Sequence, residues 1–207
     1  MKNLDRREFL KKTGEGAALA GAVALAGACA PKKTAETVAS AVVSDDGKDP
    51  LETGKMELRT NPGNGDKVSL LGYGCMRFTM KKDSDGKNIV DQENCNKLID
   101  YALAHGVNYF DTAYIYSGSE DCLGRILAET GRRSDVRVAT KLPQYLMHST
   151  AGIDKTFRTQ LSRLRTDHVD YYLMHMFTDF AEWENLKRLG IEDWFAAHKA
   201  DGSVGQV

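Results

Sequence analysis

Four polar residues of this chain each follow an apolar run of strand-like composition: Asp111, Tyr116, Lys141 and His175. A carboxylate, a phenol, an ammonium and an imidazole in one place could protonate a carbonyl oxygen while a hydride reaches the carbonyl carbon. A phenol alone is a weak acid, with a reference pKa of about 10. Because a neighbouring ammonium favours the phenolate, Lys141 beside Tyr116 would make that phenol a better proton donor.

The remaining two residues would support this pair. Asp111 would bind Lys141, fix its direction and keep it charged where water is excluded. His175 would donate a hydrogen bond to the substrate oxygen and orient it, as an oxyanion-hole donor does. Since no side chain supplies a hydride, this chemistry requires a cofactor.

Each of the four residues also has a simpler explanation when it is taken alone. Tyr116 lies in a tyrosine-rich segment and could be a packing residue. Lys141 could be a solvated charge, Asp111 a helix cap and His175 a hydrogen-bonded buried histidine. Their joint occurrence, each at the end of a strand-like run or in the loop after one, favours the catalytic interpretation.

The segments that would position these residues alternate between strand and helix. Apolar residues recur at helical spacing over residues 91–105, 119–131, 150–164, 182–189 and 192–200. Residues 56–59 and 67–70 flank a loose turn and predict a hairpin, and residues 70–74 predict the first strand of the sheet. Residues 81–88 are polar and carry a turn at Asp85-Gly86. Strands that alternate with helices favour right-handed crossovers and a parallel sheet, either a barrel or a doubly wound open sheet.

Several of these segments resemble those of the aldo/keto reductases. The matching segments are YFDTAYIY (109–116), ATK (139–141), DYYLMH (170–175) and, at the first strand, LGYGCMR (71–77). The four polar residues match the family's catalytic residue types in chain order. The resemblance covers about residues 55–207. It implies a TIM (β/α)8 barrel whose strand ends carry the site, and it decides between the barrel and the doubly wound sheet.

The resemblance also implies what the site would bind. It predicts reduction of an aldehyde or ketone, a small-molecule substrate, to an alcohol with NADP(H) or NAD(H). Cofactor contacts would come from Gly74, Cys75, Met76 and Asp111, although Cys75 and Met76 differ from the polar and aromatic types common there. The residues that distinguish NADP from NAD lie in the second half of the family's barrel.

The length predicts only part of such a barrel. A complete barrel takes about 250 residues, whereas the chain has 207 and reaches the place of the fifth strand at residues 202–207. We therefore expect about the first four strand–helix units, with open strand edges that disfavour folding of the isolated chain. A sharp, cooperative melt of the monomer would contradict that expectation. An iron–sulfur cluster, which some exported relatives bind through C-terminal cysteines, could only lie in sequence beyond this chain.

Composition excludes several classes of function. A formal net charge of −1 and the lack of a basic stripe argue against a nucleic-acid partner. The four cysteines form no Cys-x-x-Cys motif, so neither a disulfide framework nor a metal site is predicted. Cys95 and Cys122 fall on apolar faces of expected helices, where burial is the expectation.

The first 54 residues predict an export signal and a linker. DRREFLKK (5–12) resembles a twin-arginine signal, and the uncharged apolar run at 16–31 is too short for a membrane span of about 20 residues but suits a signal peptide. Cys29 could be the lipidated residue of a lipoprotein signal, with ordinary cleavage near Ala28 as the alternative. Residues 31–54 predict a flexible linker. The protein would then be periplasmic or in the cell envelope, with membrane anchoring through Cys29 if that residue is lipidated.

Two other functions stay open from the sequence. One is a non-catalytic nucleotide-binding barrel subunit, which would have no need to keep all four polar residues. The other is an inactive truncated fragment.

Overall fold

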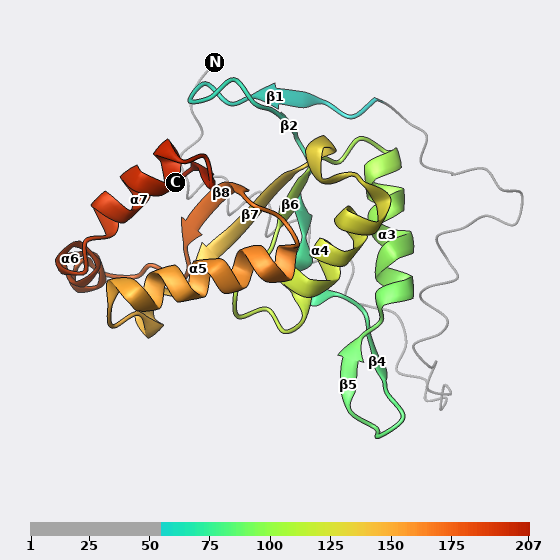
Figure 1. Ribbon diagram of the computed structural model, residues 1–207. Coiled ribbons are helices and arrows are strands. Elements are labelled where there is room, and N and C mark those ends of the chain that lie inside the picture. The colour runs from blue at the N-terminus through green and yellow to red at the C-terminus, as the bar shows by residue number, and fades with distance from the viewer. Residues whose placement is uncertain (1–54) are drawn as a thin grey trace, which may run out of the picture. The chain divides into compact units, whose positions relative to one another are not determined.

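The computed structural model describes residues 55–207, and their centre is a five-stranded parallel sheet (Figure 1). Its strands, in spatial order, are β3 (Tyr73–Gly74), β6 (Tyr109–Asp111), β7 (Arg137–Leu142), β8 (Val169–Met174) and β9 (Val204–Gln206). Spatial order therefore equals chain order. Among the described residues β3 and β9 are the two edges of the sheet.

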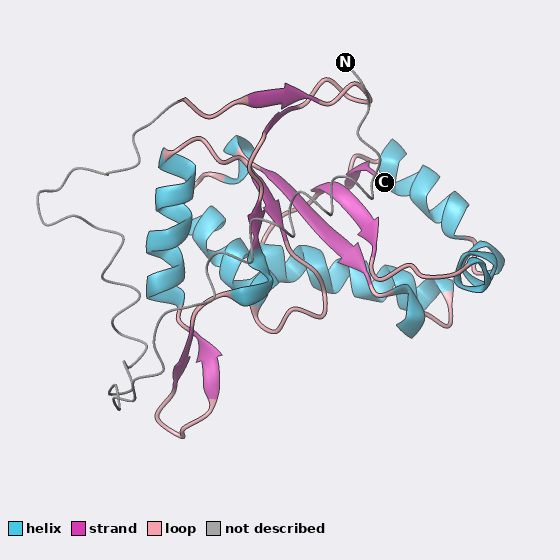
Figure 2. Ribbon diagram, turned by 180° about the vertical axis from the view of Figure 1, so that it is seen from behind, coloured by secondary structure: helices cyan, strands magenta, loops and turns pink. Residues whose placement is uncertain are grey.

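Helices connect the strands and lie on one face of the sheet. They are α3 (Gln92–Ala104), α4 (Ser119–Thr130), α5 (Thr150–Leu164), α6 (Phe180–Arg188) and α7 (Ile191–Ala200), with 3-10 turns η1 (Cys75–Arg77), η2 (Arg133–Asp135) and η3 (Gln144–Leu146). Figure 2, seen from behind, shows the central strands in front of the helices. A doubly wound sheet would carry helices on both faces and reverse its strand order. The fold is therefore part of a parallel α/β barrel, as predicted.

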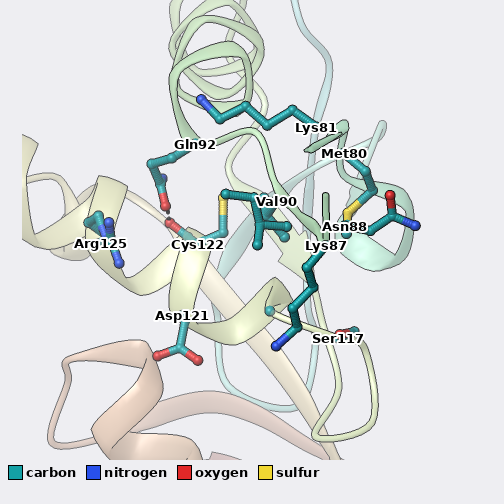
Figure 3. A pocket seen from close by; sticks show the side chains of 12 residues that line it. Met80, Lys81, Lys87, Asn88, Val90, Gln92, Ser117, Asp121, Cys122 and Arg125 are labelled. Carbon is teal, nitrogen blue, oxygen red and sulfur yellow. Dashed lines mark hydrogen bonds between the residues drawn. The ribbon is translucent and has the colours of Figure 1, made fainter. Parts of the chain in front are cut away.

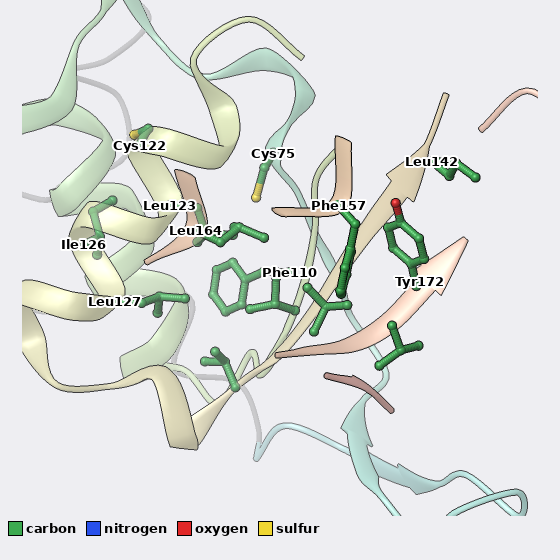
Figure 4. Close-up of a cluster of buried hydrophobic side chains, with 14 of the residues drawn as sticks. Cys75, Phe110, Cys122, Leu123, Ile126, Leu127, Leu142, Phe157, Leu164 and Tyr172 are labelled. Carbon is green, nitrogen blue, oxygen red and sulfur yellow. The ribbon is translucent and has the colours of Figure 1, made fainter. Parts of the chain in front are cut away.

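The hydrophobic core lies between the sheet and these helices (Figure 4). Phe110 of β6 and Tyr172 of β8 are fully buried there, and Tyr172 packs against Phe157 of α5 and Trp194 of α7. Successive side chains of a strand point to opposite faces. The residues that flank Phe110 and Tyr172 therefore face the other side, which would be the interior of a barrel.

The helices begin and end close to the predicted positions because their caps are encoded locally. The Asp91 and Ser149 side chains accept hydrogen bonds from Asn94 N and Gly152 N at the starts of α3 and α5. Gly131 follows α4 with φ of +67°, the left-handed conformation that favours glycine. The fourth helix begins two residues earlier than predicted, at Phe180.

The predicted first hairpin is present as β1 (Leu58–Thr60) and β2 (Lys67–Ser69). Its turn reaches the sheet, because Asp66 lies 2.9 Å from Arg137 Nε and accepts a hydrogen bond from the Tyr171 hydroxyl at 3.1 Å. Arg137 is the first residue of β7, so the hairpin contacts the amino-terminal end of this strand.

The turn predicted at Asp85-Gly86 is present, but the hairpin around it was not predicted: β4 (Met80–Lys82) and β5 (Asn88–Val90) pair as antiparallel strands. These strands are short and largely exposed, so no alternating apolar pattern marks them. The first sheet strand is only Tyr73–Gly74, because Leu70 N bonds back to Glu57 O in the first hairpin.

The predicted export signal, the Cys29 lipidation site and the linker lie outside the described residues. Within residues 55–207, no helix is both long enough and apolar enough to cross a bilayer.

Candidate active site

The carboxyl ends of β6, β7 and β8 bring three of the four predicted residues to one edge of the sheet. Asp111 is the last residue of β6, Lys141 lies one residue before the end of β7, and His175 directly follows β8. The strands are parallel and in register, with Asp111 opposite Ala139 and Lys141 opposite Leu173. Lys141 is therefore two residues further toward the site than the register partner of Asp111, and its side chain reaches back to that carboxylate.

Lys141 is held by two acceptors. Its Nζ lies 2.5 Å from Asp111 Oδ1 and 2.7 Å from the carbonyl oxygen of Thr112. The Lys141 side chain is 12% exposed and that of Asp111 34% exposed. A charge-assisted hydrogen bond of this kind is shorter and stronger than a neutral one. The ammonium therefore has a fixed position at the carboxyl edge of the sheet.

Tyr116 joins this pair from the loop between β6 and α4. The loop turns through hydrogen bonds from Tyr116 N to Ala113 O and from Ser119 N to Tyr116 O, both 3.0 Å long. The Tyr116 ring centroid lies 5.1 Å from Lys141 Nζ, within the range of a cation–π contact. The phenol ring thus lies against the held ammonium.

His175 closes the group on the side of β8. Its ring meets that of Tyr116 edge to face, with centroids 5.5 Å apart, and its backbone N–H bonds to Leu142 O at 2.9 Å. Burial lowers the pKa of His175 below its ordinary value of 6.5, and the Lys141 ammonium lowers it further, while the Asp111 carboxylate acts in the opposite direction. The imidazole is therefore neutral at pH 7, with one N–H to donate and one nitrogen to accept.

The backbone turns sharply after His175. Met176 has φ of +54° and is exposed. A left-handed conformation of a residue other than glycine costs on the order of 1–3 kcal/mol and is found often at functional sites.

The predicted cofactor contacts differ in where their side chains point. Gly74 is exposed and stands in register with Asp111, and Met76 is exposed as well. Cys75 is fully buried in the core (Figure 4), and burial raises the pKa of its thiol far above the usual range. We therefore correct the expectation for the Cys75 side chain: a cofactor above the sheet could contact only the backbone of this residue.

Two hydroxyl side chains beside the site were not predicted. Ser119 Oγ donates to Cys75 O at 2.8 Å and lies 2.7 Å from Thr112 Oγ1. Both side chains are fully or almost fully buried. They join the loop after β3 to the loop after β6. The sequence signal was small hydroxyl residues next to Asp111 and at a helix start, which is also an ordinary capping pattern.

Two further cysteines lie in the interior, and the described residues contain no candidate metal site. Cys95 and Cys122 are buried, as predicted, and burial raises the pKa of both thiols, that of Cys122 to about 12. Across residues 55–207, no group of three His, Cys, Asp or Glu side chains is arranged to hold a metal ion.

A hollow of about 550 Å³ lies outside the four-residue group (Figure 3). The β4–β5 hairpin and α4 form its walls, with Lys87, Val90, Asp121 and Arg125 among its lining residues. Ser117, next to Tyr116, also lines it, but none of the four predicted catalytic residues does. It is therefore a neighbour of the site and not the site itself.

Comparisons with known proteins agree with this geometry. A family model described as "Aldo/keto reductase family" matches residues 70–197. Aldo-keto reductase str7 of Strobilurus tenacellus is 31% identical over 124 residues, which are 58% of this chain and 37% of that protein. Aryl-alcohol dehydrogenase [NADP(+)] of Phanerodontia chrysosporium is 29% identical over 134 residues, 56% of this chain and 35% of that protein.

A solved structure shows the same likeness. The holo form of the aldo-keto reductase AKR11C1 from Bacillus halodurans superposes with a TM-score of 0.56 and 29% identity, over 72% of this chain and 48% of that one. The chain thus spans less than half the length of this structure and of the two curated relatives.

Proposed function

Because the chain belongs to the aldo/keto reductase family, we propose that its strand ends reduce an aldehyde or ketone to an alcohol with a nicotinamide cofactor. One observation carries the proposal. Lys141 is bound by Asp111, and the Tyr116 ring lies 5.1 Å from the Lys141 ammonium. This arrangement would place a phenolic proton donor beside a positive charge at the carbonyl oxygen, with the neutral His175 imidazole next to the phenol ring.

Each residue has a role that follows from its chemistry. Tyr116 donates its phenolic proton to the carbonyl oxygen, which gains negative charge as the substrate is reduced. Lys141 stabilises the phenolate that is left behind, and Asp111 keeps the ammonium in place. His175 donates an N–H to the same oxygen and orients the substrate, which a neutral imidazole can do.

The residues present fit a nicotinamide dinucleotide. A Cβ added to Gly74 would meet nothing within 4 Å, so open space lies beside the end of β3. Gly74, the backbone of Cys75, Met76 and Asp111 would contact the cofactor, which supplies the hydride when bound. We favour the phosphorylated form, because one relative is named as an NADP(+) enzyme.

The test is Tyr116→Phe in the full chain, measured as NADPH oxidation with a panel of aldehydes and ketones. Loss of a positioned proton donor lowers a rate by about 10²- to 10⁴-fold, while NADPH binding should stay within about twofold, since the ring and its packing remain. Tyr101→Phe, on the exposed side of α3, is the matched control and should leave the rate of NADPH oxidation unchanged.

The outcomes separate the alternatives. Turnover that survives Tyr116→Phe refutes the assignment of the acid. NADPH binding without turnover in the unaltered chain supports a non-catalytic nucleotide-binding subunit, and neither binding nor turnover supports an inactive fragment.

We also propose that the protein is exported by the twin-arginine route to the periplasm or cell envelope. Arg6 and Arg7, followed by the uncharged segment at 16–31, support this address. Lipidation of Cys29 would add a membrane anchor. With a single acyl chain, the membrane binding of this anchor would be only marginal.

A further inference from the structure

A buried polar group lies on the helix side of the sheet, directly behind Lys141. We call Glu120, Thr140, Gln160 and Arg163 the Glu120 cluster. The carboxylate of Glu120 is 1% exposed. One of its oxygens accepts from Thr140 Oγ1 at 2.7 Å and from Gln160 Nε2 at 2.9 Å, and the other from Arg163 Nη1 at 3.2 Å.

Arg163 connects this cluster to the loop that carries the phenol. The Nη1 atom that binds Glu120 also donates to the carbonyl oxygen of Tyr114 at 3.2 Å. The guanidinium lies 4.6 Å from the centroid of the Tyr114 ring. Tyr114 stands two residues before Tyr116. The arginine therefore holds the backbone of the Tyr116 loop from the side opposite the site.

Gln160 connects the same cluster to two strands. Its Nε2 lies 3.1 Å from the carbonyl oxygen of Lys141 and 2.9 Å from Thr140 Oγ1. Its Oε1 accepts from the buried Tyr172 hydroxyl at 2.7 Å. Tyr172 lies three residues before His175 on β8. One amide thus contacts the strand of Lys141 and the strand that leads to His175.

Gly124 is what allows α4 and α5 to come close enough for these contacts. It lies one helical turn after Glu120, and a Cβ at this position would stand 2.5 Å from the backbone of Leu164. Real Cβ atoms essentially never approach backbone this closely, so only glycine fits without a shift of one helix.

Joining two helices and a strand through a buried carboxylate has an unfavourable desolvation free energy. A buried carboxylate is costly unless it is paired and fully hydrogen-bonded, and apolar residues of similar size would often stabilise a fold as well or better. The contacts of the cluster with Tyr114, Lys141 and Tyr172 instead reach the three segments that carry Tyr116, Lys141 and His175.

We propose that Glu120 and Arg163 are positioning residues, which fix the Tyr116 loop against the Lys141 strand and so set the distance between phenol and ammonium. This inference rests on the proposed function for the pair it positions. A misplacement of about 1 Å at a reacting group can cost on the order of 100-fold in rate, so a loosened loop should lower kcat much more than it raises KM.

The test uses the full chain with Glu120→Gln, and with Arg158→Gln as control. Arg158 is also on α5, but it is exposed, and among residues 55–207 its ion-pair partner is Asp154 of the same helix. Two quantities are measured: amide hydrogen exchange of the loop at residues 113–118, and kcat and KM for NADPH-dependent reduction. Glu120→Gln should speed exchange of this loop about tenfold and lower kcat about 10- to 100-fold, with KM within about threefold. Arg158→Gln should change neither quantity.

A second variant keeps the test decisive if the single change unfolds the chain. Glu120→Gln combined with Arg163→Gln leaves no unpaired buried charge, so folding should recover while the loop stays fast-exchanging. Unchanged loop exchange in either folded variant overturns the proposal, as does faster exchange spread evenly over all strands. Failure of both variants to fold, with Arg158→Gln folded, assigns the cluster to folding alone and also overturns it.

The exchange measurement does not depend on activity. If the unaltered chain shows no turnover, the proposed function fails, while loop exchange still decides whether the Glu120 cluster holds residues 113–118.

Discussion

Gly124→Ala should lower the free energy of unfolding, although the same change in an exposed helix would raise it. In the middle of an exposed helix, alanine is more favourable than glycine by about 0.8–1.0 kcal/mol. Gly124 instead lies where its Cβ would stand 2.5 Å from backbone atoms of Leu164. Backbone cannot rotate away, so α4 must move, and with it the buried side chains Leu123 and Leu127.

The magnitude follows from these two opposing effects. Overpacking of a core costs typically about 1–3 kcal/mol, and the backbone contact places this site near the upper value. Subtracting the helix-propensity gain leaves a net loss of about 2 kcal/mol, roughly a 30-fold change in the folding equilibrium. With a urea m-value of about 2 kcal/mol/M, the unfolding midpoint should fall by about 1 M.

The assay is urea unfolding followed by tryptophan fluorescence, because Trp194 is buried against Tyr172 and reports on the core. Gly152→Ala in α5 is the matched control. A Cβ there would meet only a side-chain oxygen, Ser149 Oγ, at 3.3 Å. Its midpoint should stay level or rise by up to about 0.5 M. A rise of the midpoint for Gly124→Ala as well would refute the close packing of α4 on α5.

Three further predictions concern protonation, thiols and export. Burial lowers the pKa of His175 in the folded state, so below pH 6.5 the unfolded chain binds more protons than the folded one, and the free energy of unfolding should fall as the pH drops through that range. The free energy of unfolding of His175→Gln should fall less between pH 7.5 and 5.5, and equal falls in the variant and the unaltered chain would contradict this. Cys95 and Cys122 should react with a thiol reagent only in urea, because burial raises the pKa of both, and complete labelling within minutes in buffer would be evidence against their burial. Replacing Arg6 and Arg7 by lysine should leave the protein in the cytoplasm on cell fractionation, whereas unchanged export would exclude the twin-arginine route.

The helices were predictable because their signals are local. A cap such as Asp91, a stop such as Gly131 and an apolar stripe between them all lie within one segment of sequence. The β4–β5 hairpin was not predictable in the same way, because its strands are three residues long and almost wholly exposed. The choice of a barrel over a doubly wound sheet came from the family resemblance and not from periodicity, since both folds have the same alternation along the chain.

The residues of the candidate site could be proposed from the sequence, but the buried Glu120 cluster behind them could not. Asp111 and Lys141 lie near the carboxyl ends of neighbouring strands, so parallel pairing brings them to the same edge of the sheet. Glu120 and its partners lie 20 to 43 residues apart in sequence. The one local sign was a polar residue in an apolar helical stripe, as with Gln160 between Phe157 and Leu164. The inward direction of the Cys75 thiol likewise depends on packing that no short motif records.

The proposed reaction depends on the ammonium of Lys141, held by Asp111, making the Tyr116 phenol a proton donor. The most direct test is single-turnover oxidation of bound NADPH by the full chain with an excess of aldehyde, for Lys141→Met and for a control, Lys187→Met on α6, where the ammonium pairs with Glu184. We expect Lys141→Met to slow the turnover by at least about 100-fold while NADPH still binds, and Lys187→Met to leave the rate unchanged. A Lys141→Met rate equal to that of the unaltered chain would contradict this dependence.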